Sequence, residues 1–159
     1  MKPSASQALD SVIPITGKSA INSITTGFSS GDESNDHFIR RNGIEFAGTH
    51  LILDLWEAQE LDKLELMESA MRDAVTTCGA TLLHIYLHHF TPSYGISGVA
   101  VLAESHISVH TWPERNFAAF DIFMCGDAKP ELAIPVLKHA FKPGRINIAE
   151  QLRGINESL

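Results

Sequence analysis

The residues of this 159-residue chain that are best suited to covalent chemistry lie around the dipeptide Glu104-Ser105. It separates two β-rich runs, 96–102 and 107–112, so a turn is expected there. A serine hydroxyl in a strained turn can attack the preceding carbonyl carbon and convert the peptide bond into an ester. Loss of the serine α-proton then splits the ester, and the resulting dehydroalanine hydrolyses to a pyruvoyl group. This chemistry needs a nearby base and groups that hold the oxyanion. Taken alone, Glu-Ser in a turn is most often only a turn.

Two other kinds of site fit the sequence less well. His84 and His88 share one face of an expected strand, as do His106 and His110. Four residues along a strand span about 13 Å, which is too far for two ligands of one ion, so no metal site is expected. The run 94–98 lacks the leading glycine of a hydrolase nucleophile elbow and enters a strand rather than a helix.

Composition narrows the class of protein. The net charge of −7 argues against a nucleic-acid partner, because phosphate binding needs a basic face. Two cysteines, Cys78 and Cys125, do not make a disulfide framework, so a reduced, cytoplasmic compartment is expected. No apolar run is long enough to span a membrane, and the N-terminus shows no signal peptide.

The chain divides into a tail and one domain. Residues 1–43 are rich in Ser, Thr, Gly and Asn, which predicts a disordered N-terminal tail. Residues 44–159 predict the order β-α-β-β-β-β-α-β, with Pro135 expected to kink the second helix. The expected elements are strands at 46–56, 80–90, 96–102, 107–112, 117–125 and 145–152, and helices at 61–78 and from Asp127 to Phe141.

This order predicts an α+β fold, a two-layer sandwich of a mostly antiparallel sheet with two helices on one face. The strands carry few charges on either face. A second sheet is therefore expected to cover the open side, most simply from a symmetric partner, which makes a four-layer αββα dimer.

Four segments together resemble the bacterial and archaeal S-adenosylmethionine decarboxylase proenzymes. The main one is AESHISVHTWPE at 103–114, and the resemblance runs from about Gly48 to Gly154. The others are YGISG at 94–98, just after His89-Phe90, AAFDIFMCG at 118–126 and EQLRG at 150–154.

The resemblance implies a self-cleaving, pyruvoyl-dependent decarboxylase of S-adenosylmethionine that supplies spermidine biosynthesis. Cleavage between Glu104 and Ser105 would give a β chain of residues 1–104 and an α chain of residues 105–159. Ser105 would become the pyruvoyl group, which binds the substrate amine as a Schiff base. His110 would be the processing base, Ser97 would assist processing, and Cys125 would be the proton donor.

The resemblance also implies a substrate site. Phe90 and, with weaker support, Phe46 and Trp112 are candidates to stack on the adenine, and Glu114 is a candidate to bind the ribose hydroxyls. On the residues alone, Phe90 and Phe46 at strand ends are more often core. Two alternatives stay open: a pyruvoyl-dependent decarboxylase of ornithine or arginine on the same scaffold, and an uncleaved regulatory homologue.

Strand geometry separates the candidate catalytic residues. Ser105 and His110 are five residues apart, so a straight strand places them on opposite faces about 16 Å apart. In a hairpin, Ser97 pairs near His110, far from Ser105. One chain therefore does not bring all four residues together. A homodimer with shared active sites is expected, each site taking Ser105 and Cys125 from one chain and Ser97 and His110 from the other.

Overall fold

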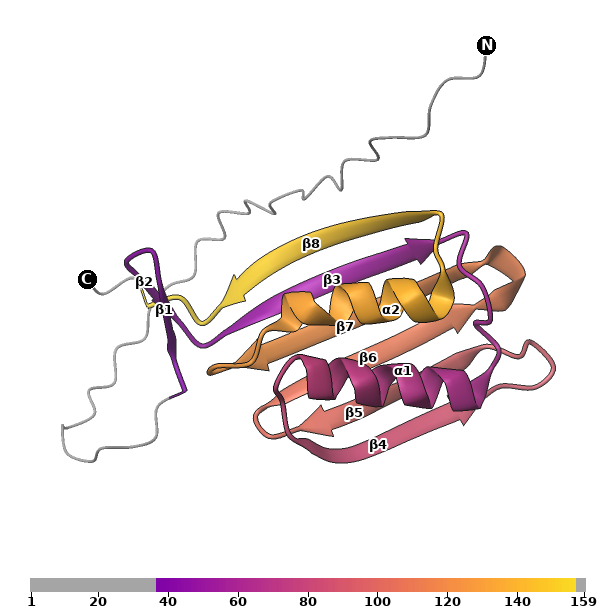
Figure 1. The fold of residues 1–159 in the computed structure, drawn as a ribbon, viewed down its shortest axis with the longest axis horizontal. Helices are drawn as coiled ribbons and strands as arrows, with labels where there is room; N and C mark the ends of the chain where they lie inside the picture. The colour runs from indigo at the N-terminus through magenta and orange to yellow at the C-terminus, as the bar shows by residue number, and fades with distance from the viewer. Residues whose placement is uncertain (1–36, 157–159) are drawn as a thin grey trace, which may run out of the picture.

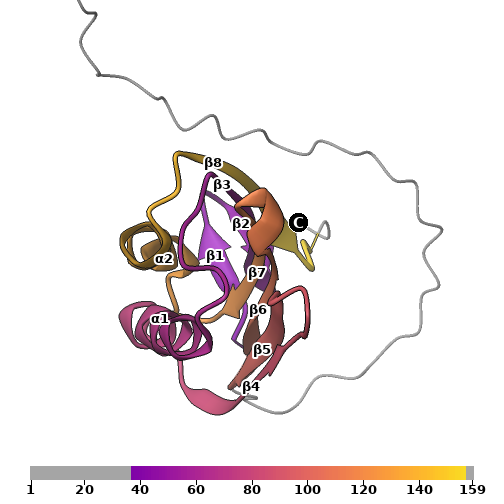
Figure 2. The ribbon, with the colours of Figure 1, turned by 90° about the vertical axis from the view of Figure 1, so that its right-hand side faces the viewer.

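The computed structural model describes residues 37–156, which form an antiparallel sheet with two helices against one face (Figures 1 and 2). A separate two-stranded hairpin crosses one end of the sheet. The hairpin strands are β1 (Ile39–Arg41) and β2 (Ile44–Phe46), and the helices are α1 (Leu64–Thr77) and α2 (Ala133–Phe141). The sheet strands are β3 (Gly48–Trp56), β4 (Leu82–His89), β5 (Ile96–Leu102), β6 (Ser105–Trp112), β7 (Phe117–Cys125) and β8 (Arg145–Arg153). Two 3-10 turns, η1 (Pro113–Arg115) and η2 (Pro130–Leu132), precede β7 and α2.

The spatial order of the six strands is β4-β5-β6-β7-β3-β8, and every neighbouring pair is antiparallel. Strands β4 to β7 follow the chain order as a meander. Strand β3 pairs along its full length with both β7 and β8. The β5–β6 turn meets Cys125 through the pairing of the consecutive strands β6 and β7. The start of β3 meets Cys125 through the pairing of β3 with β7, which are distant in sequence.

The core lies between the sheet and the helices. Alternate residues of each strand point toward the helices, as a half-buried sheet requires. Helices α1 and α2 present apolar stripes at spacings of three and four to them. The largest fully buried side chains are Phe46, Leu53, Leu55, Met67, Met71, Ile96, Leu102, Ile107, Phe120, Ile122, Met124 and Phe141.

The predicted α+β class and its two helices on one face are confirmed, with differences at the ends of elements. Helix α2 begins later than predicted, because the 3-10 turn at Pro130–Leu132 precedes it. The expectation that Pro135 kinks this helix is wrong, because it assumed that Pro135 lies in the interior of the helix. Pro135 lies in the first turn of α2, where its missing N–H would have no intrahelical partner anyway.

The β1–β2 hairpin is the element that sequence reasoning missed. The domain was expected to begin at residue 44, but residues 39–41 form a strand that pairs with 44–46. The turn between them is Asn42-Gly43, with φ of 53° and 78°. Asn-Gly with two positive φ values is the preferred two-residue hairpin turn, so the signal was present. Residues 1–36, the rest of the predicted tail, lie outside the described residues.

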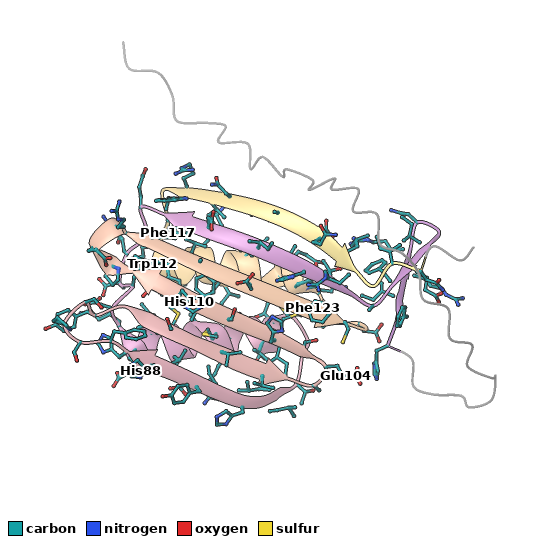
Figure 3. The ribbon with its side chains drawn as sticks, turned by 180° about the vertical axis from the view of Figure 1, so that it is seen from behind. His88, Glu104, His110, Trp112, Phe117 and Phe123 are labelled. Carbon is teal, nitrogen blue, oxygen red and sulfur yellow. The ribbon has the colours of Figure 1, made fainter. Side chains whose placement is uncertain are left out.

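The face of the sheet away from the helices, here called the open face, carries exposed apolar and aromatic side chains (Figure 3). Trp56, Phe117 and Trp112 stack in a row on it, with ring centroids 4.3 and 5.2 Å apart. Others that stand exposed are Ile52, Tyr86 and Val101. An extended apolar surface of this kind is typical of a protein interface, which agrees with the expectation that a second sheet covers it.

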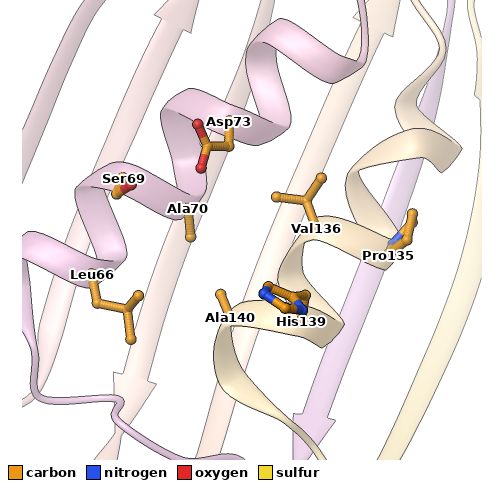
Figure 4. Close-up of a pocket in the computed structure, with 8 residues that line it drawn as sticks. All are labelled: Leu66, Ser69, Ala70, Asp73, Pro135, Val136, His139 and Ala140. Atoms are coloured by element: carbon orange, nitrogen blue, oxygen red, sulfur yellow. The ribbon is translucent and has the colours of Figure 1, made fainter.

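The helix side has a hollow between α1 and α2 with a volume of about 420 Å³ (Figure 4). Its wall is mostly apolar, and Asp73 and His139 are the ionisable residues on it. None of the predicted site residues lines it. Neither helix of residues 37–156 has the length and apolar character needed to cross a membrane.

We predict that Leu53→Ala lowers the free energy of unfolding by about 2–5 kcal/mol, because Leu53 is fully buried in the central strand β3. Urea denaturation at a fixed protein concentration measures the change. Leu83→Ala is the matched control, since Leu83 is 64% exposed and the substitution should cost about 0.5 kcal/mol or less. Equal losses for the two variants would contradict this core assignment.

Candidate active site

The predicted cleavage site is a tight hairpin turn between β5 and β6. Leu102 pairs with Ser105, so Ala103 and Glu104 alone make the connection. Glu104 has φ of 61°, a left-handed conformation that is uncommon for a residue with a side chain. The turn is therefore shorter than the expected break at residues 103–106, and Ser105 is already the first residue of β6. The candidate scissile bond therefore follows directly on a strained residue.

Cys125 lies beside this turn because β7 runs antiparallel to β6 and ends there. The backbone N–H of Cys125 donates to Ser105 Oγ at 3.2 Å. The Cys125 Sγ atom lies 3.5 Å from the same oxygen. The predicted nucleophile and the predicted proton donor, twenty residues apart in the sequence, are therefore in direct contact.

The thiol also reaches the carbonyl that Ser105 would attack. Cys125 Sγ donates to Glu104 O at 3.1 Å. A donor on that oxygen polarises the carbonyl and would stabilise the negative charge that develops on it. This end of the sheet therefore brings together the Ser105 hydroxyl, the Glu104 carbonyl and a donor to that carbonyl oxygen from Cys125.

A pocket of about 250 Å³ opens on this cluster. It is bounded by the cleavage turn, the end of β7, the start of the segment after it, and the loop that follows α1. The residues that line it are His37, Gly79, Ala80, Thr81, Ala103, Glu104, Ser105, Cys125, Gly126, Asp127 and Ala128.

Ser97 and His110 form a second cluster toward the other end of the sheet. They are direct partners across β5 and β6, as predicted, and Ser97 Oγ and His110 Nδ1 share a hydrogen bond of 2.8 Å. His110 is exposed and its ring stands beside that of Trp112. In Figure 3, Trp112 and Phe117 lie toward one end of the open face and Glu104 lies at the other. The structure therefore pairs Ser105 with Cys125, and Ser97 with His110, but does not bring the two pairs together in one chain.

Most predicted substrate residues accompany the Ser97–His110 cluster. Phe90, at the end of β4, is 43% exposed, and Trp112 stands on the open face against Phe117. Glu114 is exposed in η1, directly after β6. These side chains are accessible at the same end of the sheet, so they are available to a ligand there.

Phe46 lies apart from the other predicted substrate residues, in the hairpin beside the start of β3. Its side chain is fully buried, and the Arg41 guanidinium lies 5.3 Å from the centroid of its ring. A ring enclosed in this way has no free face for an adenine. Phe46 is instead buried at the hairpin end of the sheet, outside the cluster of apolar side chains between the sheet and the helices.

The remaining cysteine and a further histidine also take defined places. Cys78 is buried at the end of α1, and burial raises the pKa of its thiol to about 11, which makes it an unreactive core residue. His37 was not considered from the sequence, yet its Nε2 lies 3.3 Å from Glu104 Oε2. No local pattern indicates this contact, because it joins the segment before β1 to the β5–β6 turn.

Comparisons with known proteins match most of the described part of the chain. The family model described as S-adenosylmethionine decarboxylase matches residues 49–154. Two relatives named S-adenosylmethionine decarboxylase proenzyme come from Thermomicrobium roseum and Methanococcus aeolicus. The first is 46% identical over 109 residues, covering 68% of this chain and 94% of that protein. The second is 50% identical over 110 residues, covering 67% and 93%.

A solved structure shows the same fold. It is the crystal structure of the adenosylmethionine decarboxylase from Aquifex aeolicus, which superposes with a TM-score of 0.66 at 32% identity. The match covers 72% of this chain and 96% of that one. Since the matched region contains both clusters, and the family model spans more than half of the sequence, this chain belongs to the S-adenosylmethionine decarboxylase family.

Proposed function

We propose that this chain is a proenzyme that cleaves itself between Glu104 and Ser105, and that the product decarboxylates S-adenosylmethionine. The observation that carries the proposal is the contact of Cys125 with both reacting groups. Its N–H reaches Ser105 Oγ, and its thiol reaches the Glu104 carbonyl oxygen, at a turn held in a left-handed conformation. Membership of the family supports the same reaction.

Self-cleavage follows from these positions. Ser105 Oγ attacks the Glu104 carbonyl carbon, the C–N bond breaks, and an ester joins the two residues. A base then removes the Ser105 α-proton, the Cβ–O bond breaks, and Glu104 leaves as a carboxylate. The dehydroalanine that remains takes up water and releases ammonia, which leaves a pyruvoyl group at position 105. Relief of strain at Glu104 favours the first step, because cleavage frees that residue from its positive φ.

The chain's own residues fit a pyruvoyl group at position 105. The Cys125 N–H that donates to Ser105 Oγ can donate equally to a ketone oxygen nearby, and the pocket beside it leaves room for a substrate. A pyruvoyl group supplies an electrophilic carbonyl that accepts electrons as carbon dioxide leaves. The thiol of Cys125 is placed to deliver a proton beside it, and its partly exposed position leaves it able to exchange that proton with solvent.

The active site requires a second chain. Ser97 and His110 lie on the same strand pair as Ser105 but toward its far end, so His110 of the same chain does not reach the α-proton. A two-fold axis through the open face would set the Ser97–His110 cluster of one chain against the Ser105–Cys125 cluster of the other. The exposed apolar side chains of the open face supply the area for that contact. The proposed assembly is an αββα dimer with two composite sites.

The same assembly places the substrate. Phe90, Trp112 and Glu114 lie with Ser97 and His110, so in the dimer they would face the partner's position 105. Exposed aromatic faces suit an adenine ring and a sulfonium charge, and a carboxylate suits ribose hydroxyls. We therefore propose that one chain binds the nucleoside while the other supplies the reactive group.

We predict that Ser105→Ala gives a single intact chain, because it removes the attacking hydroxyl. Denaturing mass spectrometry of the purified protein measures this. The unchanged chain should give fragments 1–104 and 105–159, the second beginning with a pyruvoyl group. Ser69→Ala, on the exposed side of α1, is the matched control and should cleave normally. A wild-type chain that stays intact for days, with unmodified Ser105, would refute self-cleavage.

We predict that Ser105→Ala and His110→Ala chains, each uncleaved alone, complement each other when mixed. The one intact composite site takes Ser105 from the His110→Ala chain and His110 from the Ser105→Ala chain, so only the His110→Ala chain should be cut. A mass tag on one chain identifies which is cleaved after co-refolding. If neither chain is cleaved in a verified mixed dimer, the processing sites are not shared.

We predict release of carbon dioxide from S-adenosylmethionine and not from ornithine or arginine. Glu114→Gln should raise KM for S-adenosylmethionine about tenfold with a smaller change in kcat, because a hydrogen bond to a charged group is lost. Carboxyl-labelled substrates measure both. Glu131→Gln, an exposed residue of η2, serves as the control. Comparable turnover of ornithine or arginine would contradict a nucleoside-specific site.

A further inference from the structure

We propose that His37 is a positioning residue for self-cleavage, which acts by holding the Glu104 side chain. This inference rests on the self-cleavage proposed above. His37 belongs to the segment before β1 and precedes residue 49, where the family match begins. The contact is therefore made by a part of this chain that lies outside the matched region.

Two contacts fix His37 at the cleavage turn. Its backbone oxygen accepts from the Gly126 N–H at 3.1 Å, directly after Cys125. Its imidazole Nε2 lies 3.3 Å from Glu104 Oε2. The packing against Gly126 is close, since a Cβ placed there would lie 3.4 Å from His37 Nδ1. His37 also lines the pocket that opens on Ser105.

The hairpin that follows His37 is anchored to the far edge of the sheet. Arg41 forms an ion pair of 2.7 Å with Glu150 of β8. The Asn156 N–H donates to Glu45 O at 2.9 Å, and the Ala47 N–H donates to Arg153 O at 2.8 Å. In Figure 1 the hairpin crosses the end of the sheet at which β7 finishes. His37 therefore lies just before a hairpin that is bonded to the edge of the sheet.

The chemical reason for the contact is competition for one proton. The Cys125 thiol has two acceptors on Glu104, the carbonyl oxygen at 3.1 Å and the side-chain Oε2 at 3.8 Å. A thiol can donate to only one of them, and a carboxylate is the stronger acceptor. The His37 contact holds Oε2 in place at 3.8 Å from Cys125 Sγ, so the carbonyl oxygen that Ser105 attacks, at 3.1 Å, stays the nearer acceptor for the thiol proton. Without His37 we expect the carboxylate to draw the thiol away from that carbonyl.

The expected effect is moderate, because both side chains of the pair are about half exposed, at 50% for His37 and 56% for Glu104. We expect His37→Ala to slow self-cleavage about two- to fivefold in the full-length chain. His37→Gln should restore most of the rate, since the glutamine side-chain amide can donate from about the position of Nε2. His139→Ala, an exposed histidine of α2, is the matched control and should cleave at the wild-type rate.

A double-mutant cycle separates this role from a structural one. Rates of fragment formation are measured by mass spectrometry for the wild type, His37→Ala, Glu104→Gln and the double variant. If His37 acts through the carboxylate, His37→Ala adds no further slowing once Glu104 is an amide. Thermal unfolding of Ser105→Ala with and without His37→Ala, both uncleaved, should give the same midpoint.

The outcomes are distinguishable. A wild-type chain that does not cleave refutes the proposed function itself. A wild-type chain that cleaves, with His37→Ala equally fast, refutes the role of His37 alone. The same conclusion follows if His37→Ala slows cleavage by the same factor in the Glu104→Gln chain, or lowers the unfolding midpoint, because the residue would then act on the fold rather than on the carboxylate.

Discussion

The antiparallel pairing of β6 with β7 is the constraint on which the site depends. Strand β7 ends beside the start of β6, so that Cys125 contacts the Glu104-Ser105 turn. One residue then contacts the nucleophile through its N–H and the carbonyl through its thiol. A shift of register by one residue would turn the Cys125 side chain to the other face and break both contacts. The long β3 pairing on the other side of β7 holds that register in place.

The sheet that assembles one half of the site also separates it from the other half. Its strands are long enough to keep the Ser97–His110 pair well away from Ser105. A single chain therefore cannot fold its base onto its own nucleophile without breaking the ladder. The open face carries Trp56, Phe117 and Trp112 in a stack, and we propose that a second copy of the chain packs on it. In this proposal the same second chain covers the apolar face and completes the active site.

The N-terminal hairpin lies at the same end of the sheet, where we propose that His37, just before it, acts on the cleavage turn. Its ion pair to Glu150 and its backbone bonds to Gly126 and Arg153 bring His37 over the cleavage turn. A strained turn beside a thiol has several acceptors that compete for few protons. In this proposal His37 holds the carboxylate in place and so affects which acceptor the thiol uses, without taking part in the reaction. In this way the segment at His37 could affect cleavage of the Glu104-Ser105 peptide bond.

The sequence by itself determined the α+β class, the helix and strand order, the Ser97–His110 pairing and the position of the turn. These follow from apolar periodicity and from hairpin geometry, which are local properties. The β1–β2 hairpin also had a local signal, Asn42-Gly43, which was overlooked. Only the tertiary structure decided that Phe46 is buried under Arg41, that the Cys125 thiol lies on the Glu104 carbonyl, and that His37 reaches Glu104. The Cys125 and His37 contacts join separate segments of the chain, whereas Arg41 and Phe46 belong to one hairpin. All three depend on strand pairing and packing, which the pattern of a short stretch of sequence does not specify.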